Sequence, residues 1–175
     1  MKEENVKKRI GFDLDGVLAD HAKNRRKISK NPGIKEGCRE VKELIYGEIS
    51  LTADIIKGAQ KAVKILEKDF ELFVISRRQQ KHSKYAGIWL KKNFNFASKN
   101  IFFVEKDEDK ARVIKKLGLD FFIDDKMSVL IHIRGGTKKF LFDEAGAYKK
   151  GRYGGIKAVR SFEEFLEEII RYWKQ

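Results

Sequence analysis

The sequence contains only one cysteine and one proline among its 175 residues. The single cysteine, Cys38, excludes an internal disulfide framework and any cysteine-rich zinc or iron–sulfur site. No apolar run approaches the roughly 20 residues that span a bilayer, and the charged beginning MKEENVKKRIGFD does not look like a secretory signal. We therefore expect a cytoplasmic protein with no membrane partner, folded as one domain over residues 1–175.

Positive charge predominates, since 39 Lys and Arg against 26 Asp and Glu give a formal net charge of +13. Such an excess is typical of nucleic-acid-binding proteins, but it also describes a solvated, lysine-rich surface. We favour the second interpretation because the basic residues are spread along the chain, and a basic nucleic-acid-binding module is the alternative. The densest basic segment is 21–30, HAKNRRKISK, and residues 144–155 form a second segment rich in Gly, Lys and Tyr.

Apolar segments of strand length alternate with segments of helical periodicity, which is typical of an α/β protein with a parallel sheet. Strands are expected at 6–12, 71–75, 101–104, 121–123 and 139–142, with a short extended piece at 156–159. Helices are expected at 35–49, 55–68, 81–92 and 107–117, and from the capping box Ser161–Glu164 to about residue 173. The pattern predicts a three-layer, Rossmann-like parallel sheet flanked by helices.

Side chains of chemical use follow three of these strands. Asp13 and Asp15 follow the first strand, Ser76 follows the second, and Asp124 and Asp125 follow the fourth. Ligands of an open parallel sheet bind beyond the carboxyl ends of its strands, so these side chains are expected to converge. Clustered carboxylates need a cation between them, and oxygen ligands without His or Cys favour Mg²⁺.

These ordered motifs resemble the haloacid dehalogenase (HAD) superfamily of phosphohydrolases. The matching motifs are Asp13-Leu-Asp15-Gly-Val-Leu, Ser76 after Leu-Phe-Val-Ile, Lys110, and Phe-Phe-Ile-Asp124-Asp125. Within the superfamily, the runs DGVLAD and IDDK, together with Ser76-Arg77 and Trp89-Leu90, look like the 5′(3′)-deoxyribonucleotidases and related bacterial nucleotidases. The resemblance covers about residues 8 to 143 and implies the HAD-type form of the predicted fold.

The resemblance implies a two-step phosphoryl transfer with Mg²⁺ as cofactor. Asp13 would attack phosphorus and form an aspartyl phosphate, while Asp15 would protonate the leaving oxygen and later deprotonate water. The metal site would comprise Asp13, Asp15 through its backbone carbonyl, and one acid of the pair Asp124 and Asp125, with Asp125 preferred as the direct ligand.

The resemblance also implies that Ser76, Arg77 and Lys110 contact the phosphoryl group. Lys110 is preferred over Lys106 because it lies 14 positions before Asp124, a spacing that the family commonly shows. Arg77 has an alternative role in a surface ion pair. The three histidines show no metal-ligand spacing and are expected to be ordinary helix or loop residues; they are His21, His82 and His132.

The family inserts a small helical cap after the first strand, which corresponds here to about residues 19–57. Basic residues at the start of this segment would favour an anionic substrate. Only Tyr46 is aromatic there, so the base-stacking residues of the deoxyribonucleotidases are not recognisable. The expected substrate is a small phosphorylated molecule, most simply a nucleotide. The alternatives are a sugar phosphate, another small metabolite, or the 3′-phosphate end of a nucleic acid.

Overall fold

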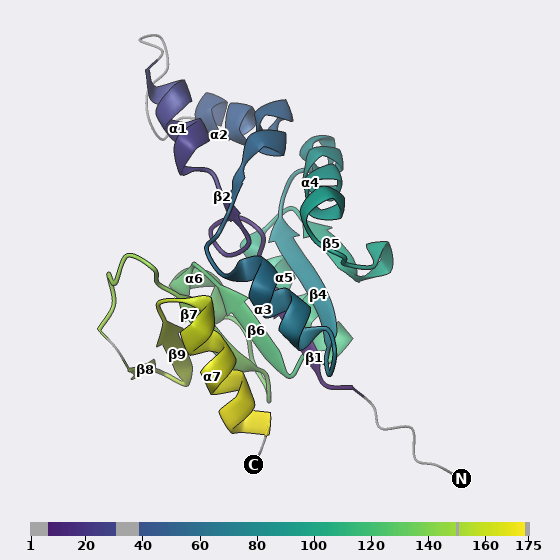
Figure 1. Ribbon diagram of the computed structural model, residues 1–175, viewed down its shortest axis with the longest axis vertical. Helices are drawn as coiled ribbons and strands as arrows, with labels where there is room; N and C mark the ends of the chain where they lie inside the picture. The colour runs from purple at the N-terminus through teal and green to yellow at the C-terminus, as the bar shows by residue number, and fades with distance from the viewer. Residues whose placement is uncertain (1–6, 31–38, 150, 174–175) are drawn as a thin grey trace.

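A computed structural model describes residues 7–30, 39–149 and 151–173. Its main sheet has the strand order β5-β4-β1-β6-β7-β9-β8 (Figure 1). The parallel strands are β1 (Arg9–Phe12), β4 (Glu71–Arg77), β5 (Ile101–Val104), β6 (Phe121–Asp124), β7 (Lys138–Phe142) and β9 (Ile156–Val159). The edge strand β8 (Arg152–Tyr153) is antiparallel to β9.

Helices cover both faces of the sheet, as a parallel sheet requires. One face packs against α3 (Ala59–Leu66), α4 (Gln80–Asn93) and α7 (Phe162–Trp173), and the other against α5 (Asp107–Leu117) and α6 (Met127–Leu130). Neighbouring residues of β6 serve opposite faces, because Phe121 and Ile123 belong to the first core and Phe122 to the second. In Figure 1, α3 and α7 lie in front of the sheet and α5 and α6 behind it. The predicted three-layer α/β fold is confirmed.

A second, two-stranded sheet joins β2 (Ala19–Asp20) to β3 (Asp54–Ile55) in antiparallel fashion. Between these strands lie α1 (Ala22–Ser29), α2 (Arg39–Tyr46) and the 3₁₀ helix η1 (Glu48–Thr52). We refer to residues 19–57 as the cap segment. Figure 1 shows α1 and α2 beyond the carboxyl end of β4. These two helices pack together through a small separate apolar cluster formed by Ile28, Val41 and Ile45.

Two expected helices are shorter in the structure. The helix expected at 35–49 is α2, which ends at Tyr46; after Gly47 the chain continues as η1. The helix expected at 55–68 starts only at Ala59, because Gly58 has a φ of 84°, a left-handed conformation that a right-handed helix does not continue. Cys38 lies outside the described residues.

Other differences involve short or polar elements. The helix α1 occupies most of the basic segment 21–30, where no helix was expected. The segment 144–155 contains β8, and the 3₁₀ helix η2 (Ser98–Asn100) precedes β5. By contrast, β5, α5 and β9 have the expected bounds.

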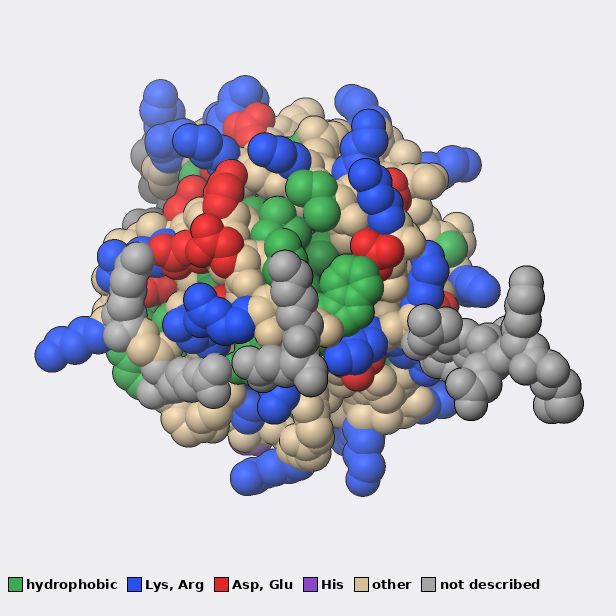
Figure 2. All heavy atoms as spheres, turned by 60° about the horizontal axis from the view of Figure 1, so that its bottom comes forward, with side chains coloured by type: hydrophobic (Ala, Val, Ile, Leu, Met, Phe, Trp, Pro, Cys, Tyr) green, Lys and Arg blue, Asp and Glu red, His purple; other side chains and the backbone are tan. Residues whose placement is uncertain are grey.

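Lys and Arg side chains are dispersed over the lower end of the molecule rather than gathered into one patch (Figure 2). Acidic and apolar side chains lie among them on this face. In the part of the chain that the structure describes, no helix combines the length and the apolarity needed to cross a membrane.

Candidate active site

The sheet order brings three chemically active strand ends together. Because β1 lies between β4 and β6, Asp13 after β1 is flanked by Ser76 of β4 and Asp124 of β6. A tight turn follows, in which the Gly16 N–H donates to the Ala19 carbonyl at 2.9 Å. Gly16 has a φ of 89°, and a Cβ there would lie 2.4 Å from Oδ2 of Asp125. The glycine therefore lets the first and fourth motifs approach each other.

Lys110 lies between two buried carboxylates. Its Nζ is 2.8 Å from Oδ1 of Asp13 and 2.7 Å from Oδ2 of Asp124. All three residues are buried. Burial alone would lower the pKa of Lys110, but the charges of Asp13 and Asp124 raise this pKa well above its usual range, so the lysine stays charged. Lys106 is exposed at the residue before α5, and thus Lys110 is the lysine that the fold brings to the acids.

The carboxylates of Asp13, Asp124 and Asp125 form a compact acidic group. One oxygen from each lies within 4.8 Å of the others. Burial, and next the charge of Asp13, raise the pKa values of Asp124 and Asp125 above their usual range. Among the described residues, Oδ1 of Asp125 is buried without a hydrogen-bond partner. An orphaned carboxylate oxygen beside two further acids fits a hard divalent cation.

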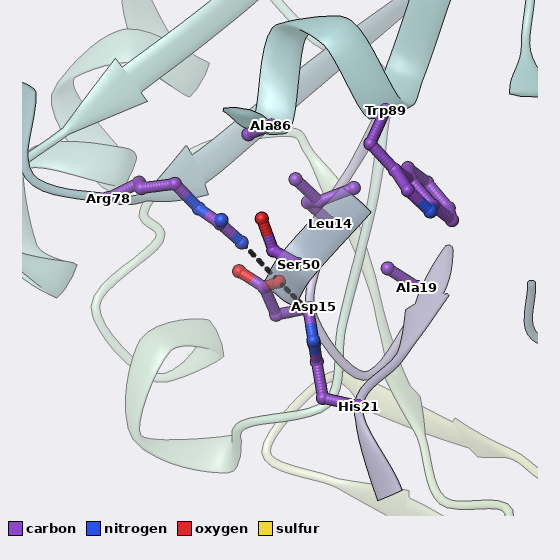
Figure 3. Close-up of a pocket in the computed structure, with 8 residues that line it drawn as sticks. All are labelled: Leu14, Asp15, Ala19, His21, Ser50, Arg78, Ala86 and Trp89. Carbon is purple, nitrogen blue, oxygen red and sulfur yellow. Dashed lines mark hydrogen bonds and ion pairs between the residues drawn. The ribbon is translucent and has the colours of Figure 1, made fainter. Parts of the chain in front are cut away.

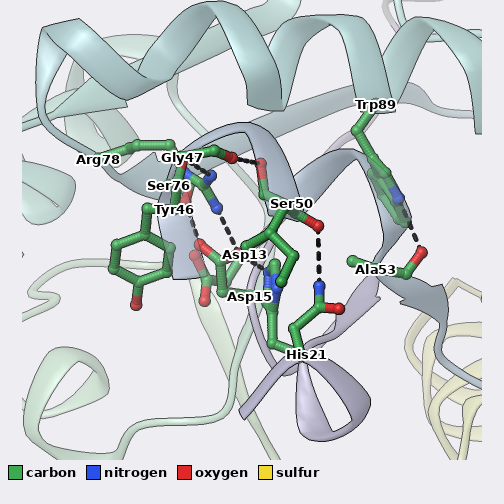
Figure 4. Close-up of polar contacts among 12 residues, drawn as sticks. Asp13, Asp15, His21, Tyr46, Gly47, Ser50, Ala53, Ser76, Arg78 and Trp89 are labelled. Carbon is green, nitrogen blue, oxygen red and sulfur yellow. Dashed lines mark hydrogen bonds and ion pairs between the residues drawn. The ribbon is translucent and has the colours of Figure 1, made fainter. Parts of the chain in front are cut away.

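The carboxylate of Asp15 lies outside this acidic group and has partners of its own. Oδ1 of Asp15 is 2.7 Å from Nε2 of His21 and forms an ion pair with Nη2 of Arg78. The hydroxyl of Ser76 donates to Oδ2 at 3.4 Å (Figure 4). Burial opposes ionisation of Asp15, but the hydrogen bond with His21 and the charge of Arg78 hold its pKa well below the usual range.

Sequence reasoning singled out neither Arg78 nor His21 as a partner of Asp15. Arg77, the arginine expected at the phosphate, instead pairs with Asp107 at 2.8 Å, which is the ion-pair alternative. The side chain of Arg78 is 1% exposed and that of Arg77 is 35% exposed. His21 carries no metal-ligand signal, and its role depends on the turn that folds β2 back beside Asp15. The only signal for Arg78 in the sequence is that it is the second of two arginines directly after the Ser76 motif.

Two hollows meet at Arg78. The smaller one is lined by Asp15, His21 and Arg78, together with residues that include Ser50 and Trp89 (Figure 3). The larger one, about 270 Å³, lies between α2 and the segment after β4. Its lining residues are Lys42, Glu43, Tyr46, Arg77, Arg78, Gln79, His82 and Glu105. We call it the α2–β4 cavity. His82 therefore lies at this cavity, whereas His132 is exposed elsewhere.

Comparison with known proteins agrees with this geometry. No protein-family model matches the chain. It is 32% identical over 188 residues to the Oceanobacillus iheyensis protein named "Putative nucleotidase OB0422", a match that covers 93% of this chain and 99% of the relative. A HAD hydrolase of family IA from Entamoeba histolytica has the same fold, with a TM-score of 0.67 and 15% identity over 96% of this chain and all of that one. The magnesium-bound "putative HAD-hydrolase YfnB" of Bacillus subtilis matches with a TM-score of 0.64 and 11% identity over 94% and 99% of the two chains.

The fold, together with these similarities, defines an enzyme of the phosphohydrolase class. The chain belongs to the HAD superfamily, in the nucleotidase-like branch that contains the Oceanobacillus protein.

Proposed function

We propose that the protein is a Mg²⁺-dependent phosphomonoester hydrolase that acts on a nucleotide through an aspartyl-phosphate intermediate. The observation that carries this proposal is the buried contact of Lys110 with both Asp13 and Asp124, with Oδ1 of Asp125 beside them and without a hydrogen-bond partner among the described residues. The fixed cation of Lys110 orients the Asp13 carboxylate and offsets its charge in a buried place, which suits a nucleophile.

Mg²⁺ would be held by Asp13, the backbone carbonyl of Asp15 and Asp125. Asp125 is the preferred direct ligand because both oxygens of Asp124 already accept hydrogen bonds, one from Lys110 and one from the Lys126 N–H at 2.9 Å. The bound ion supplies positive charge that neutralises the transferring phosphoryl group.

In the first step, a carboxylate oxygen of Asp13 attacks phosphorus, and the bond from phosphorus to the leaving oxygen breaks. Lys110 and Ser76 lie where they can hold phosphoryl oxygens during this transfer. Asp15 gives its proton to the leaving oxygen, which departs as an alcohol. His21 and Arg78 favour the ionised form of Asp15, so we infer that the negative charge of the bound phosphate raises the pKa of Asp15 enough for it to carry this proton.

In the second step, water attacks phosphorus and the bond between phosphorus and Asp13 breaks. Asp15, now ionised, accepts the proton of the attacking water. The ion pair with Arg78 and the contact with His21 stabilise this ionised form of Asp15. Inorganic phosphate leaves, and Asp13 is again a carboxylate. Asp15 passes the proton to the departing phosphate or to solvent, returns to its ionised form, and is protonated again when the next substrate binds.

We infer that the α2–β4 cavity receives the nucleoside part of the substrate. Arg78 lines both this cavity and the hollow around Asp15, so a group attached to the leaving oxygen would extend into it. Its volume of about 270 Å³ suits a small ligand. In this proposal the cap segment covers the site, and the name of the Oceanobacillus relative supports a nucleotide as substrate.

The test is phosphate release from nucleoside monophosphates, sugar phosphates, 3′-phosphorylated oligonucleotides and p-nitrophenyl phosphate, with Mg²⁺ or with EDTA. We expect nucleoside monophosphates to be hydrolysed fastest, and only with Mg²⁺. Asp13→Asn should reduce release to background, while the exposed Asp69→Asn should behave as wild type. Metal-independent release, or full activity of Asp13→Asn, would contradict the mechanism, and faster release from sugar phosphates or oligonucleotides would contradict the substrate.

A further inference from the structure

Arg78 connects the site to the cap segment. From its position directly after β4, Nη2 pairs with Oδ1 of Asp15, and Nη1 lies 3.5 Å from the carbonyl oxygen of Tyr46. The guanidinium also lies over the Tyr46 ring, 4.6 Å from its centroid. Figure 4 shows Arg78 between Tyr46 and Asp15. One buried side chain therefore touches the candidate acid–base residue and the last residue of α2.

Tyr46 also contacts the other partner of Asp15. Its ring meets the His21 ring edge to face, with centroids 6.2 Å apart. The two groups that hold Oδ1 of Asp15 are thus both packed against the same aromatic ring. Packing of this kind restricts the rotamers of the long arginine side chain, which would otherwise lose considerable entropy when it is fixed at Asp15.

A second contact joins the same helix to the body of the protein. Glu43 lies one helical turn before Tyr46, and its Oε2 is 2.8 Å from Nε2 of His82 at the start of α4. Lys81 pairs with the same oxygen. These contacts hold α2 against α4 at the position where Tyr46 covers Arg78.

We propose that Arg78 is a positioning residue that makes the alignment of Asp15 depend on the seating of α2 through Tyr46. This inference rests on the proposed function of Asp15 as acid and base. Without the ring of Tyr46, the guanidinium loses its packing partner and Asp15 loses its fixed orientation towards the leaving oxygen. In this role Arg78 connects the position of α2 to proton transfer by Asp15. Binding of the phosphate is not its main role.

The consequence is a dependence on the leaving group. A nucleoside alkoxide needs a proton as it departs, whereas p-nitrophenolate departs readily without one. Loss of Asp15 alignment should therefore slow the first step, in which the leaving group departs, much more for a nucleotide than for p-nitrophenyl phosphate. The second step, in which Asp15 accepts a proton from water, is the same for both substrates. Loss of a phosphate-binding arginine would weaken both reactions alike, because both substrates carry the same phosphoryl group.

The experiment compares wild type, Arg78→Ala, Tyr46→Leu and Tyr46→Phe, with the exposed Arg171→Ala as control. For each, kcat, KM and the first-turnover rate of leaving-group release at saturating substrate are measured on a nucleoside monophosphate and on p-nitrophenyl phosphate. We expect the first-turnover rate on the nucleotide, divided by that on p-nitrophenyl phosphate, to fall at least about tenfold in Arg78→Ala and Tyr46→Leu, within the range that general acid–base catalysis supplies. Tyr46→Phe keeps the ring and the carbonyl, so this ratio should fall much less in Tyr46→Phe than in Tyr46→Leu, whatever change in KM it causes.

Hydrogen–deuterium exchange of the same variants supplies a readout that needs no activity. Amides of residues 39–52 should exchange faster in Arg78→Ala and Tyr46→Leu, and remain unchanged in Arg171→Ala. An equal loss of the first-turnover rate on both substrates, or unchanged exchange in this segment, overturns the proposal. If wild type releases no phosphate from any substrate, the proposed function fails, and the exchange result alone then decides whether Arg78 ties α2 to Asp15.

Discussion

Lys110 is a buried cation whose two partners, Asp13 and Asp124, come from different strands. Lys110→Met should remove the only charge that the described contacts place between them and leave two buried acids facing each other. We expect a loss of about 3–5 kcal/mol in the free energy of unfolding, measured by urea denaturation in EDTA. Lys116→Met, at an exposed position of the same helix, should change stability little. Equal stabilities of the two variants would show that the lysine does not neutralise the site.

Gly16 permits the close approach of the first motif to Asp125. Gly16→Ala would place a methyl group 2.4 Å from Oδ2 of Asp125 and strain a backbone with a φ of 89°. We expect this variant to lose most of the rise in melting temperature that Mg²⁺ causes. Gly118→Ala is the matched control, since Gly118 also has a positive φ, 61°, but has open space around its Cβ position. A full response of Gly16→Ala to Mg²⁺ would exclude Asp125 as the ligand.

At the scale of elements, Asn24 fastens α1 to η1. Its buried side chain donates to the Ile49 carbonyl at 2.9 Å and accepts from the Thr52 hydroxyl at 3.1 Å. Asn24→Ala should remove these two hydrogen bonds, each of which contributes about 0.5–1.5 kcal/mol to stability. Amide exchange in 22–29 and 48–52 should accelerate, and KM should rise more than kcat falls. Ser29→Ala, which removes only an exposed hydrogen bond within α1, should change neither quantity.

The sequence predicts several elements of the body well and the cap segment poorly. The apolar runs of β5 and β9 and the periodicity of α5 carry their own signal, so their bounds were predicted correctly. The helix α1 has only Asn24 and Ile28 buried, which leaves almost no apolar period to detect. The two-residue strands β2 and β3 form because their partners are brought together by the body, and no local pattern encodes that pairing.

The same division holds in the site. Asp13, Lys110, Asp124 and Asp125 were predicted because each stands at a motif position on, or directly after, a regular strand or helix. The partners of Asp15 were not, because His21 and Arg78 reach it only through the turn after β1 and the packing of α2. Arg77 and Arg78 are the same residue type at neighbouring positions, so the sequence does not tell their roles apart. Their side chains point in different directions, and Arg77 forms a partly exposed ion pair whereas Arg78 forms a buried one.

At the scale of the whole molecule, the acidic group links stability to pH and metal. Burial and the charge of Asp13 raise the pKa values of Asp124 and Asp125, so the metal-free folded state binds protons that the unfolded state releases near pH 4. Stability in EDTA should therefore fall as pH rises from about 4 towards neutrality. Mg²⁺ replaces those protons, so its effect on melting temperature should grow over the same interval. The measurement is thermal unfolding at pH 5, 6 and 7.5 with EDTA or Mg²⁺, and a pH-independent effect would contradict this linkage.

The pairing of β2 with β3 means that the polypeptide leaves the body and returns to it at a single point, where Ala19 stands opposite Ile55. The segment between these two residues is therefore an insertion whose two ends are held together by the β2–β3 pairing. Its own sequence does not have to bring them together. Lengthening or replacing that insertion costs little loop-closure entropy, because closure entropy grows only slowly with length. The architecture therefore allows different inserted segments to be accommodated at the β2–β3 pair without a change in the main sheet that carries the site.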